Sequence, residues 1–433
     1  MQANLIACPE CDLLQQEVEI PCPGAARCSR CGVALYRNPK DGLNRMLALT
    51  VAAAIVFIVA NVVPLMGLSA VGRETSTTIL GGVQEMWRQG REVTAVIVGF
   101  CAVIAPALDI GFMLTILLAV RLPPAPRWAG ALMRWSQIVR PWRMVEVMIL
   151  GILVALIKIA ELATVIPDIG MFAVGVLVVL LTAMMVSFEP RDVWARVQWA
   201  AKAAPGRVAS RKAAGARAGT ITSDTLTAAQ AGLVSCEVCG LLSWPADPDE
   251  PGHCPRCGEA LIFRRHNAIQ RTWALIIAAV ICYIPANLFP VLTTITPVSV
   301  DQDTIMDGVI LLYTSGSWPL ALIVLIASVI IPLAKLIALA YLLITVQRRS
   351  LKSRHERGRL YRMVEFIGRW SMLDVFVDTF VVALVRLAPL MAVEPGPGVP
   401  FFGMMVVLTM LAADSFDPRL IWDTSDDTRE QHG

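Results

Sequence analysis

Long apolar runs alternate with short polar intervals along this chain, and the runs predict helices that cross a membrane. Crossing about 30 Å of hydrocarbon takes about 20 residues at 1.5 Å per residue. We interpret eight runs as spans, which makes the chain a mainly α, polytopic membrane protein. The eight runs are Met46–Met66, Val93–Val120, Met144–Ile166, Met171–Phe188, Thr272–Leu292, Trp318–Val346, Ser371–Val393 and Val399–Ala413.

The composition supports the membrane class. The 433 residues are 56% hydrophobic and 16% charged, with a mean hydropathy of +0.64, whereas soluble domains carry about 25% charged residues. About 45 polar residues precede the first run, so we expect no secretory signal. The net charge of +3 is small, and we expect no nucleic-acid partner.

The second half of the sequence repeats the first. Ala60-Asn61-Val-Val-Pro64 matches Ala286-Asn287-Leu-Phe-Pro290, and Ser187-Phe-Glu-Pro-Arg191 matches Ser415-Phe-Asp-Pro-Arg419, at nearly the same separation along the chain. Single residues match in the same order: Pro106 with Pro332 and Trp142 with Trp370. Each half has an even number of predicted spans, so we predict two parallel four-helix repeats related by an axis along the membrane normal.

Four C-x-x-C pairs precede the two sets of spans, two pairs before each set. The short interval between the two pairs of each half is typical of a zinc ribbon. Four thiolates close the coordination sphere, so we predict two structural Zn²⁺ ions and no catalytic metal. A redox switch is the alternative role for these thiols. The predicted ligands are Cys8, Cys11, Cys28 and Cys31 in the first ribbon and Cys236, Cys239, Cys254 and Cys257 in the second.

The predicted domain boundaries follow from these patterns. A first ribbon (1–42) and a first transmembrane repeat (43–190) are followed by a surface helix and flexible linker (191–232). The surface helix is predicted because Trp194 and Trp199 lie among basic residues, a pattern typical of membrane-surface helices. A second ribbon (233–266), a second repeat (267–416) and a short tail (417–433) complete the chain.

Basic residues predict the orientation. Arg127, Arg134, Arg140 and Arg143 fill the loop after span two, and a similar cluster follows span six, whereas 293–317 holds three aspartates and no Lys or Arg. By the positive-inside rule, both termini and both ribbons are expected in the cytoplasm.

Ionisable residues interrupt the predicted spans. Each costs about 2.5–3.5 kcal/mol to insert, so such groups usually face a partner or a watery cavity. We expect a polar network at the interface of the halves, with Asp109 opposite Lys335; purely structural ion pairing is the alternative. The predicted network is Asp109, Lys158, Glu161, Lys335, Asp374, Asp378 and Arg386.

The A-N-x-x-P motifs leave two interpretations open. Proline frees a backbone carbonyl and kinks a helix, and a nearby asparagine can bond the freed group. Asn61 with Pro64, and Asn287 with Pro290, therefore mark either a hinge or a helix end.

Taken together, the paired cysteine ribbons, each leading four spans, and the A-N-x-x-P and S-F-x-P-R motifs resemble the paraquat-inducible protein A family, and LetA-type members in particular. The resemblance covers Cys8 to Trp422. It implies an inner-membrane partner of a periplasmic MCE-domain protein, moving phospholipid between the membranes of a Gram-negative envelope. It also implies that Lys158 and Glu161 belong to a transport network.

The sequence has no Walker lysine loop, G-x-S-x-G or H-E-x-x-H motif, so we expect no enzymatic activity and an energy input from a gradient or a partner. Two other functions stay open. One is a non-transporting scaffold that anchors a periplasmic and a cytoplasmic partner, and the other is a thiol-based stress sensor.

Overall fold

The computed structural model is mainly helical, and six of its described helices are long and apolar enough to cross a membrane. Six predicted spans coincide with these helices. The remaining two predicted spans, 144–166 and 371–393, fall for most of their length outside the described residues. The structure describes residues 5–18, 20–21, 24–38, 42–70, 73–88, 92–121, 125–140, 164–197, 226–245, 252–295, 300–314, 316, 318–350, 352–368, 386–387 and 391–423.

The first half begins with a long helix, α1, and ends with another, α7, which packs against it. Between α1 and α7 the chain forms a short three-stranded sheet with the strand order β6-β5-β7. Strands β5 and β6 come before the other described helices of this region, and β7 comes after them. The elements are α1 (Gly42–Val62), β5 (Met66–Ala70), β6 (Arg73–Thr77), α2 (Ile79–Arg88), α3 (Glu92–Gly99), η1 (Phe100–Ile104), α4 (Ala105–Val120), α5 (Arg127–Val139), β7 (Thr164–Pro167), α7 (Ile169–Ser187) and α8 (Pro190–Trp194).

The second half presents the same order of elements. Its first and last long helices, α10 and α16, pack together, and its sheet has the order β11-β10-β13-β12. The elements are α10 (Ala268–Leu288), β10 (Leu292–Ile295), β11 (Val300–Asp303), α11 (Ile305–Thr314), α12 (Trp318–Leu325), η3 (Ile326–Ile330), α13 (Ile331–Gln347), α14 (Arg354–Gly368), β12 (Arg386–Leu387), β13 (Met391–Pro395), α16 (Gly398–Ser415) and η5 (Pro418–Ile421).

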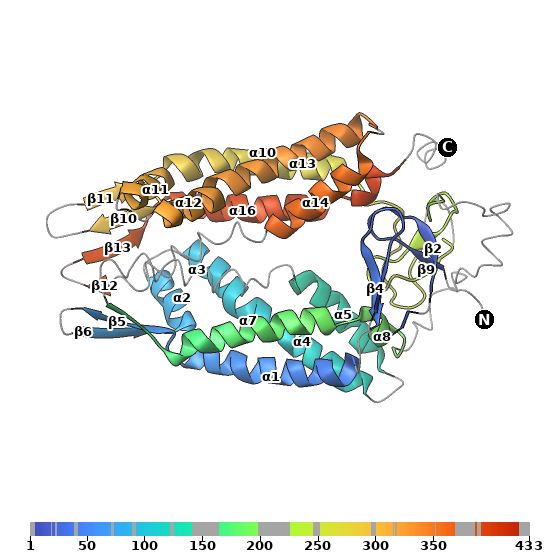
Figure 1. The fold of residues 1–433 in the computed structure, drawn as a ribbon, viewed down its shortest axis with the longest axis horizontal. Coiled ribbons are helices and arrows are strands. Elements are labelled where there is room, and N and C mark those ends of the chain that lie inside the picture. Colours follow the sequence, from blue (N-terminus) through green and yellow to red (C-terminus); the bar gives the residue numbers. More distant parts are fainter. Residues whose placement is uncertain are drawn as a thin grey trace.

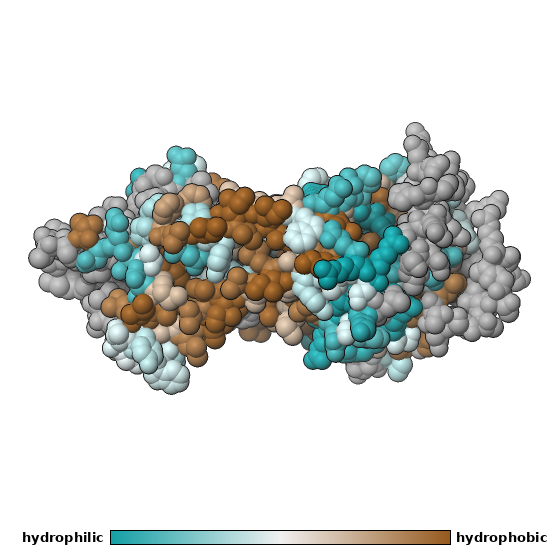
Figure 2. Space-filling view, turned by 90° about the horizontal axis from the view of Figure 1, so that it is seen from above, coloured by the Kyte–Doolittle hydropathy of each residue, from teal (hydrophilic) through white to brown (hydrophobic). Residues whose placement is uncertain are grey.

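The molecule is elongated, with its helices between two polar ends. Figure 1 shows the two halves side by side, the β5–β7 and β10–β13 sheets at one end and the cysteine ribbons at the other. An apolar band separates the hydrophilic regions of the surface in Figure 2. The halves share an apolar core that includes Val98 of α3, Val174 of α7 and Met405 of α16. This layering is what a bilayer requires of a spanning protein.

A π-helical turn interrupts the second long helix in each half. It covers Phe100–Ile104 in the first half and Ile326–Ile330 in the second. Each turn is followed two residues later by a proline, Pro106 or Pro332. A π-turn widens the helix by one residue and is frequent at functional sites, and here it precedes a buried charged residue in each half, Asp109 or Lys335.

The A-N-x-x-P motifs lie at the ends of α1 and α10. The amide of Asn61 donates to the carbonyl of Phe57 at 2.9 Å, and that of Asn287 donates to Tyr283 at the same distance. The following proline carbonyls accept from the first turns of α7 and α16, through the backbone N–H of Gly170 and Gly398. A Cβ on Gly170 would lie 2.4 Å from the Pro64 oxygen. Each proline carbonyl at the end of the first long helix is thus bonded by the last long helix of the same half.

Two local predictions are wrong. The basic segment after span two, expected as a loop, contains the helix α5, because its inner face packs on the second ribbon and on Trp194. Trp194, expected on the membrane surface, is 1% exposed. Its ring lies against Gly130, where an added Cβ would be 3.1 Å from Cζ3. The short helix α8 therefore packs its tryptophan into the protein interior.

Candidate metal centres and buried charges

The four predicted ligands of the first ribbon come together in one cluster. Two short hairpins, β1 (Leu5–Ala7) with β2 (Leu14–Gln16) and β3 (Gly24–Arg27) with β4 (Ala34–Asn38), bring Cys8, Cys11, Cys28 and Cys31 within 4.8 Å of one another, sulfur to sulfur. The Cys8–Cys31 and Cys11–Cys28 sulfurs are 3.4 and 3.5 Å apart. Tetrahedral zinc–thiolate bonds of about 2.3 Å give edges of about 3.8 Å, so the cluster fits one metal ion.

A neighbouring amide supports the thiolate form of this cluster. The side chain of Gln15 donates to the sulfur of Cys28 at 3.1 Å, and its oxygen accepts from the backbone of Ser29 at 3.3 Å. Hydrogen bonds of this kind orient a ligand and stabilise its charge.

The second cluster has the same geometry. Cys236, Cys239, Cys254 and Cys257 lie around β8 (Val234–Ser235) and β9 (Leu242–Ser243), with sulfur separations of 3.4 and 3.5 Å. Contact with the neighbouring thiols, Cys236 first, and burial raise the pKa of Cys239 well above its usual range. A divalent cation bound by the four thiolates offsets the free-energy cost of ionising these buried thiols.

The knuckle backbone needs a left-handed residue after the second cysteine of each pair. Glycine supplies it at Gly32, Gly240 and Gly258, with φ between 67° and 76°. In the first knuckle the residue is Asp12, with φ of 59°. Its side chain is used: Oδ2 accepts from the backbone of Ala229 and from Arg264, both at 3.1 Å.

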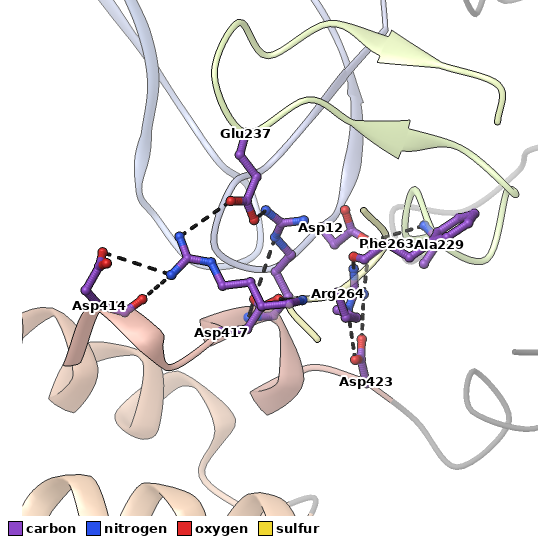
Figure 3. A network of polar contacts seen from close by, with 10 residues as sticks. Asp12, Ala229, Glu237, Phe263, Arg264, Asp414, Asp417 and Asp423 are labelled. Atoms are coloured by element: carbon purple, nitrogen blue, oxygen red, sulfur yellow. Dashed lines mark hydrogen bonds and ion pairs between the residues drawn. The ribbon is translucent and has the colours of Figure 1, made fainter. Parts of the chain in front are cut away.

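The two ribbons therefore bind each other. Arg264 of the second ribbon bridges Asp12 of the first and Asp423, with 2.7 and 3.0 Å bonds to the latter (Figure 3). The segment before the second ribbon adds backbone bonds, from Leu14 to Leu226 and from Ala228 to Asp12. Burial raises the pKa of Asp12, although Arg264 opposes the shift.

Each ribbon is also bound to its own half through the S-F-x-P-R motif. The backbone of Arg37 donates to Glu189 at 2.8 Å, and the repeat-related backbone of Arg265 donates to Asp417 at 3.3 Å. The motif arginines contact acids of the same ribbons: Arg191 with Glu17 at 2.8 Å and Arg419 with Glu237 at 2.9 Å.

Each ribbon is then seated on a helix of the opposite half. Glu10 of the first ribbon pairs with Arg362 of α14. Glu259 of the second ribbon pairs with Arg134 of α5 at 3.0 Å. Apolar packing follows the same rule, because Leu13 belongs to the same apolar cluster as Phe416 of the second half, and Leu261 to the same cluster as Met133 of the first. The ribbons thus cross between the halves.

A cavity of about 670 Å³ lies where ribbons and halves meet. Its lining contains repeat-related pairs, including Arg37 with Arg265 and Gln137 with Glu365. It therefore lies between equivalent parts of the two halves.

The buried charges in the spans divide between the halves. Asp109 is fully buried in α4, and its Oδ1 lies 3.9 Å from Nε of Arg140. Lys335, 3% exposed in α13, donates from Nζ to the hydroxyl of Thr409 at 3.1 Å. The two described residues Asp109 and Lys335 do not pair directly, because each finds a partner in its own half.

The other predicted network residues are not placed. Lys158, Glu161, Asp374 and Asp378 lie outside the described residues, and of Arg386 only the backbone, in β12, is described.

The comparison with known families also divides the chain into two halves. The family model described as "Paraquat-inducible protein A" matches residues 43–198 and 269–426, one stretch in each half. The chain belongs to the paraquat-inducible protein A family. The matched stretches contain the spans and both S-F-x-P-R motifs and leave out both cysteine ribbons.

Relatives cover nearly the whole chain. "Lipophilic envelope-spanning tunnel protein A" of Escherichia coli (strain K12) is 29% identical over 96% of this chain and 90% of its own length. "Intermembrane transport protein PqiA" of the same organism is 29% identical over 99% and 98%. A "probable intermembrane transport protein" of Haemophilus influenzae is 27% identical over 98% and 97%. No solved structure matches the chain significantly.

In this member of the paraquat-inducible protein A family, sequence reasoning missed the polar contacts that hold the ribbons. No sequence pattern paired Arg264 with Asp12 or Glu10 with Arg362. The motif acids Glu189 and Asp417 were found as repeats but without a role. The available signal was that Arg37 and Arg265 are separated along the chain by the same interval as these two acids.

Proposed function

We propose that this chain is the inner-membrane component of an MCE-type lipid transport system. It would pass phospholipid between the inner membrane and a periplasmic MCE tunnel and so maintain the outer membrane. Family membership carries the proposal, since three relatives that match over nearly their whole length are named for intermembrane transport or an envelope-spanning tunnel.

The arrangement of polar ends supports the proposed orientation. The cysteine ribbons lie at one end of the apolar band, and the β5–β7 and β10–β13 sheets, here called the strand end, lie at the other. Free thiols belong in a reducing compartment, so the ribbon end, with both termini, is proposed to be cytoplasmic. The strand end then faces the periplasm and the MCE partner.

Eight spans in two parallel repeats are part of the proposal. The six described candidate spans, the equivalent π-turns and the equivalent sheet registers support it: Met66 pairs with Pro167, as Leu292 pairs with Pro395. The two remaining spans would cross at 144–166 and 371–393.

Zinc is proposed as the structural ion of both ribbons. In both ribbons the all-cysteine donor set, with four sulfurs within 4.8 Å of one another, supports zinc, and in the first ribbon so does the Gln15 hydrogen bond. The ion would cross-link each ribbon, and the chain's own ion pairs then hold the two halves together at their cytoplasmic end.

The working residues are proposed to be the charges within the spans. Lys335 with Thr409, Asp109 with Arg140, and Lys158 and Glu161 would line or border the lipid path. Protonation of an acid in this set would be the coupling step, because the chain has no nucleotide-binding loop.

The decisive experiment is a lipid transfer assay on membranes carrying the chain and its MCE partner. Lys158→Ala and Glu161→Ala should stop transfer of labelled phospholipid while the complex still co-purifies. Transfer that continues in both variants would support the scaffold function instead. Mass spectrometry of the purified complex identifies the bound protein and lipid.

A further inference from the structure

The two halves build the same buried junction from different residues. Asp109 in α4 and Lys335 in α13 occupy matching positions of the repeat, since each comes three residues after the proline that follows the π-turn. α4 packs against α5, and α13 packs against α14. Arg140 directly follows α5 and lies near Asp109, and Gly368 is the last residue of α14 and lies near Lys335. They match as well, because each comes two residues before the repeated tryptophan.

In the first half the acid lies on α4 and the cation comes from the end of α5. Asp109 is fully buried, and the guanidinium of Arg140 approaches it at 3.9 Å. The same guanidinium stacks on the ring of Phe188, with 4.6 Å between Cζ and the ring centroid. The two opposite charges therefore form an ion-pair contact that is longer than a hydrogen bond.

In the second half the cation is Lys335 on α13. Its side chain occupies the space that a side chain at Gly368 would need. A Cβ added to Gly368 would lie 2.9 Å from Nζ of Lys335 and 3.2 Å from its Cε. No positive φ marks Gly368, so the backbone does not require glycine there. An added Cβ would instead meet the flexible end of the Lys335 side chain.

The two halves also differ at the position that contacts Lys335. Thr409, which accepts from Lys335, corresponds to Leu181 in the first half. Leu181 is fully buried and apolar. A hydroxyl therefore lies beside Lys335, whereas an apolar residue occupies the equivalent position in the half where Arg140 lies near Asp109.

We propose that Gly368 is a positioning residue that directs the ammonium of Lys335 onto Thr409. Among the described residues, position 140 supplies a cation to this junction in the first half and position 335 supplies one in the second. The inference rests on the proposed function, in which Lys335 belongs to the transport network. Because Nζ is the flexible end of a side chain, a Cβ at position 368 moves the ammonium rather than the helix.

Alanine at position 368 tests the positioning role. Gly368→Ala should lower lipid transfer about tenfold, as displacement of a working group by about 1 Å can cost up to about 10²-fold. In a Lys335→Met background the same change should have no further effect. Gly111→Ala is the matched control, because no atom lies within 4 Å of its added Cβ. Additive losses in the two backgrounds would overturn the inference.

A reciprocal exchange separates position from function. Gly368→Arg alone should lower the yield and melting temperature of the protein, because two cations meet there without room. Lys335→Asp with Gly368→Arg copies the first-half pair and should recover both, while lipid transfer is lost. A double variant no more stable than Gly368→Arg overturns the positioning role. A stable double variant that still transfers lipid overturns only the role of Lys335 in transport.

Discussion

Asp12 occupies a position where the other described knuckles have glycine. A non-glycine residue with positive φ costs about 1–2 kcal/mol, and this one is 4% exposed and carries a carboxylate. Both costs are offset by its bonds to Ala229 and Arg264. The residue that departs from the knuckle pattern is therefore the one that joins the two ribbons.

Substitutions at Asp12 should separate these contributions. Asp12→Gly removes the strain and the two bonds, and should lower the free energy of unfolding by about 1.5–3 kcal/mol. Asp12→Ala should cost about 1–2 kcal/mol more. Asp12→Asn keeps an acceptor for Ala229 and tolerates the backbone, so it should lie nearest the parent. Unfolding of the zinc-loaded chain in detergent measures the order, and equal losses for glycine and alanine would contradict it.

Glu189 should make stability depend on pH. Burial raises its pKa, opposed by the backbone N–H groups of Arg37 and Arg191. A raised pKa in the folded state means that this carboxyl stabilises the fold most below its unfolded pKa of about 4.3, and that the contribution is lost as pH rises through the folded value.

The substitution Glu189→Gln removes this titration and keeps an acceptor for Arg37. Relative to the parent, the variant should gain melting temperature as the pH is raised from mildly acidic through neutral to mildly basic. Glu92→Gln, on the exposed first turn of α3, is the control and should follow the parent. A parallel pH profile for Glu189→Gln would show that this carboxyl does not contribute.

At the scale of elements, the ribbons act as crossed braces. Each is covalently continuous with one half, docks on the S-F-x-P-R turn of that half, and sits on the amphipathic helix of the other. Movement of one half against the other must therefore strain a ribbon contact.

A double-mutant cycle on Glu10 and Arg362 measures one crossed contact. Their side chains are 17% and 34% exposed, so partial screening applies and we expect a coupling of about 0.5–1 kcal/mol. A Glu10 and Arg359 cycle on the exposed face of α14 is the control and should give a coupling near zero. Equal couplings in both cycles would mean that only long-range charge is involved.

Each ribbon should hold one ion independently of the other. Cys11→Ser with Cys28→Ser should reduce bound zinc from two ions per chain to one, measured by atomic emission on purified protein. The melting temperature should fall further than for Cys101→Ser, since Cys101 lies in the apolar core away from both clusters. Retention of two ions would exclude the assigned ligands.

At the scale of the whole molecule, the proposed orientation places the ribbon end in the cytoplasm and the β5–β7 and β10–β13 sheets in the periplasm. Lys352, before α14 at the ribbon end, and Asp301, on β11 at the strand end, are both exposed. In cells with a permeable outer membrane, Asp301→Cys should react with an impermeant maleimide, whereas Lys352→Cys should react only after lysis. The parent chain reports the background of native cysteines, and the opposite pattern would invert the orientation.

The sequence by itself determined the class of the molecule, the family, the six spans that the structure describes and the two four-cysteine clusters. These features depend on local patterns: runs of apolar residues fix a helix within a bilayer, and C-x-x-C spacing fixes a knuckle around an ion. The repeat of motifs in the second half was likewise visible without any fold, because it is a property of the chain's order.

Only the tertiary structure decided which groups meet. The sequence placed Asp109 opposite Lys335, but the fold gives them Arg140 and Thr409, because helix packing within each half brings those residues closer. The crossing of the ribbons between the halves, through Glu10 and Arg362, depends on how two folded halves are arranged. Such long-range contacts leave no spacing pattern in the chain, since the partners are far apart in sequence and either could have paired elsewhere.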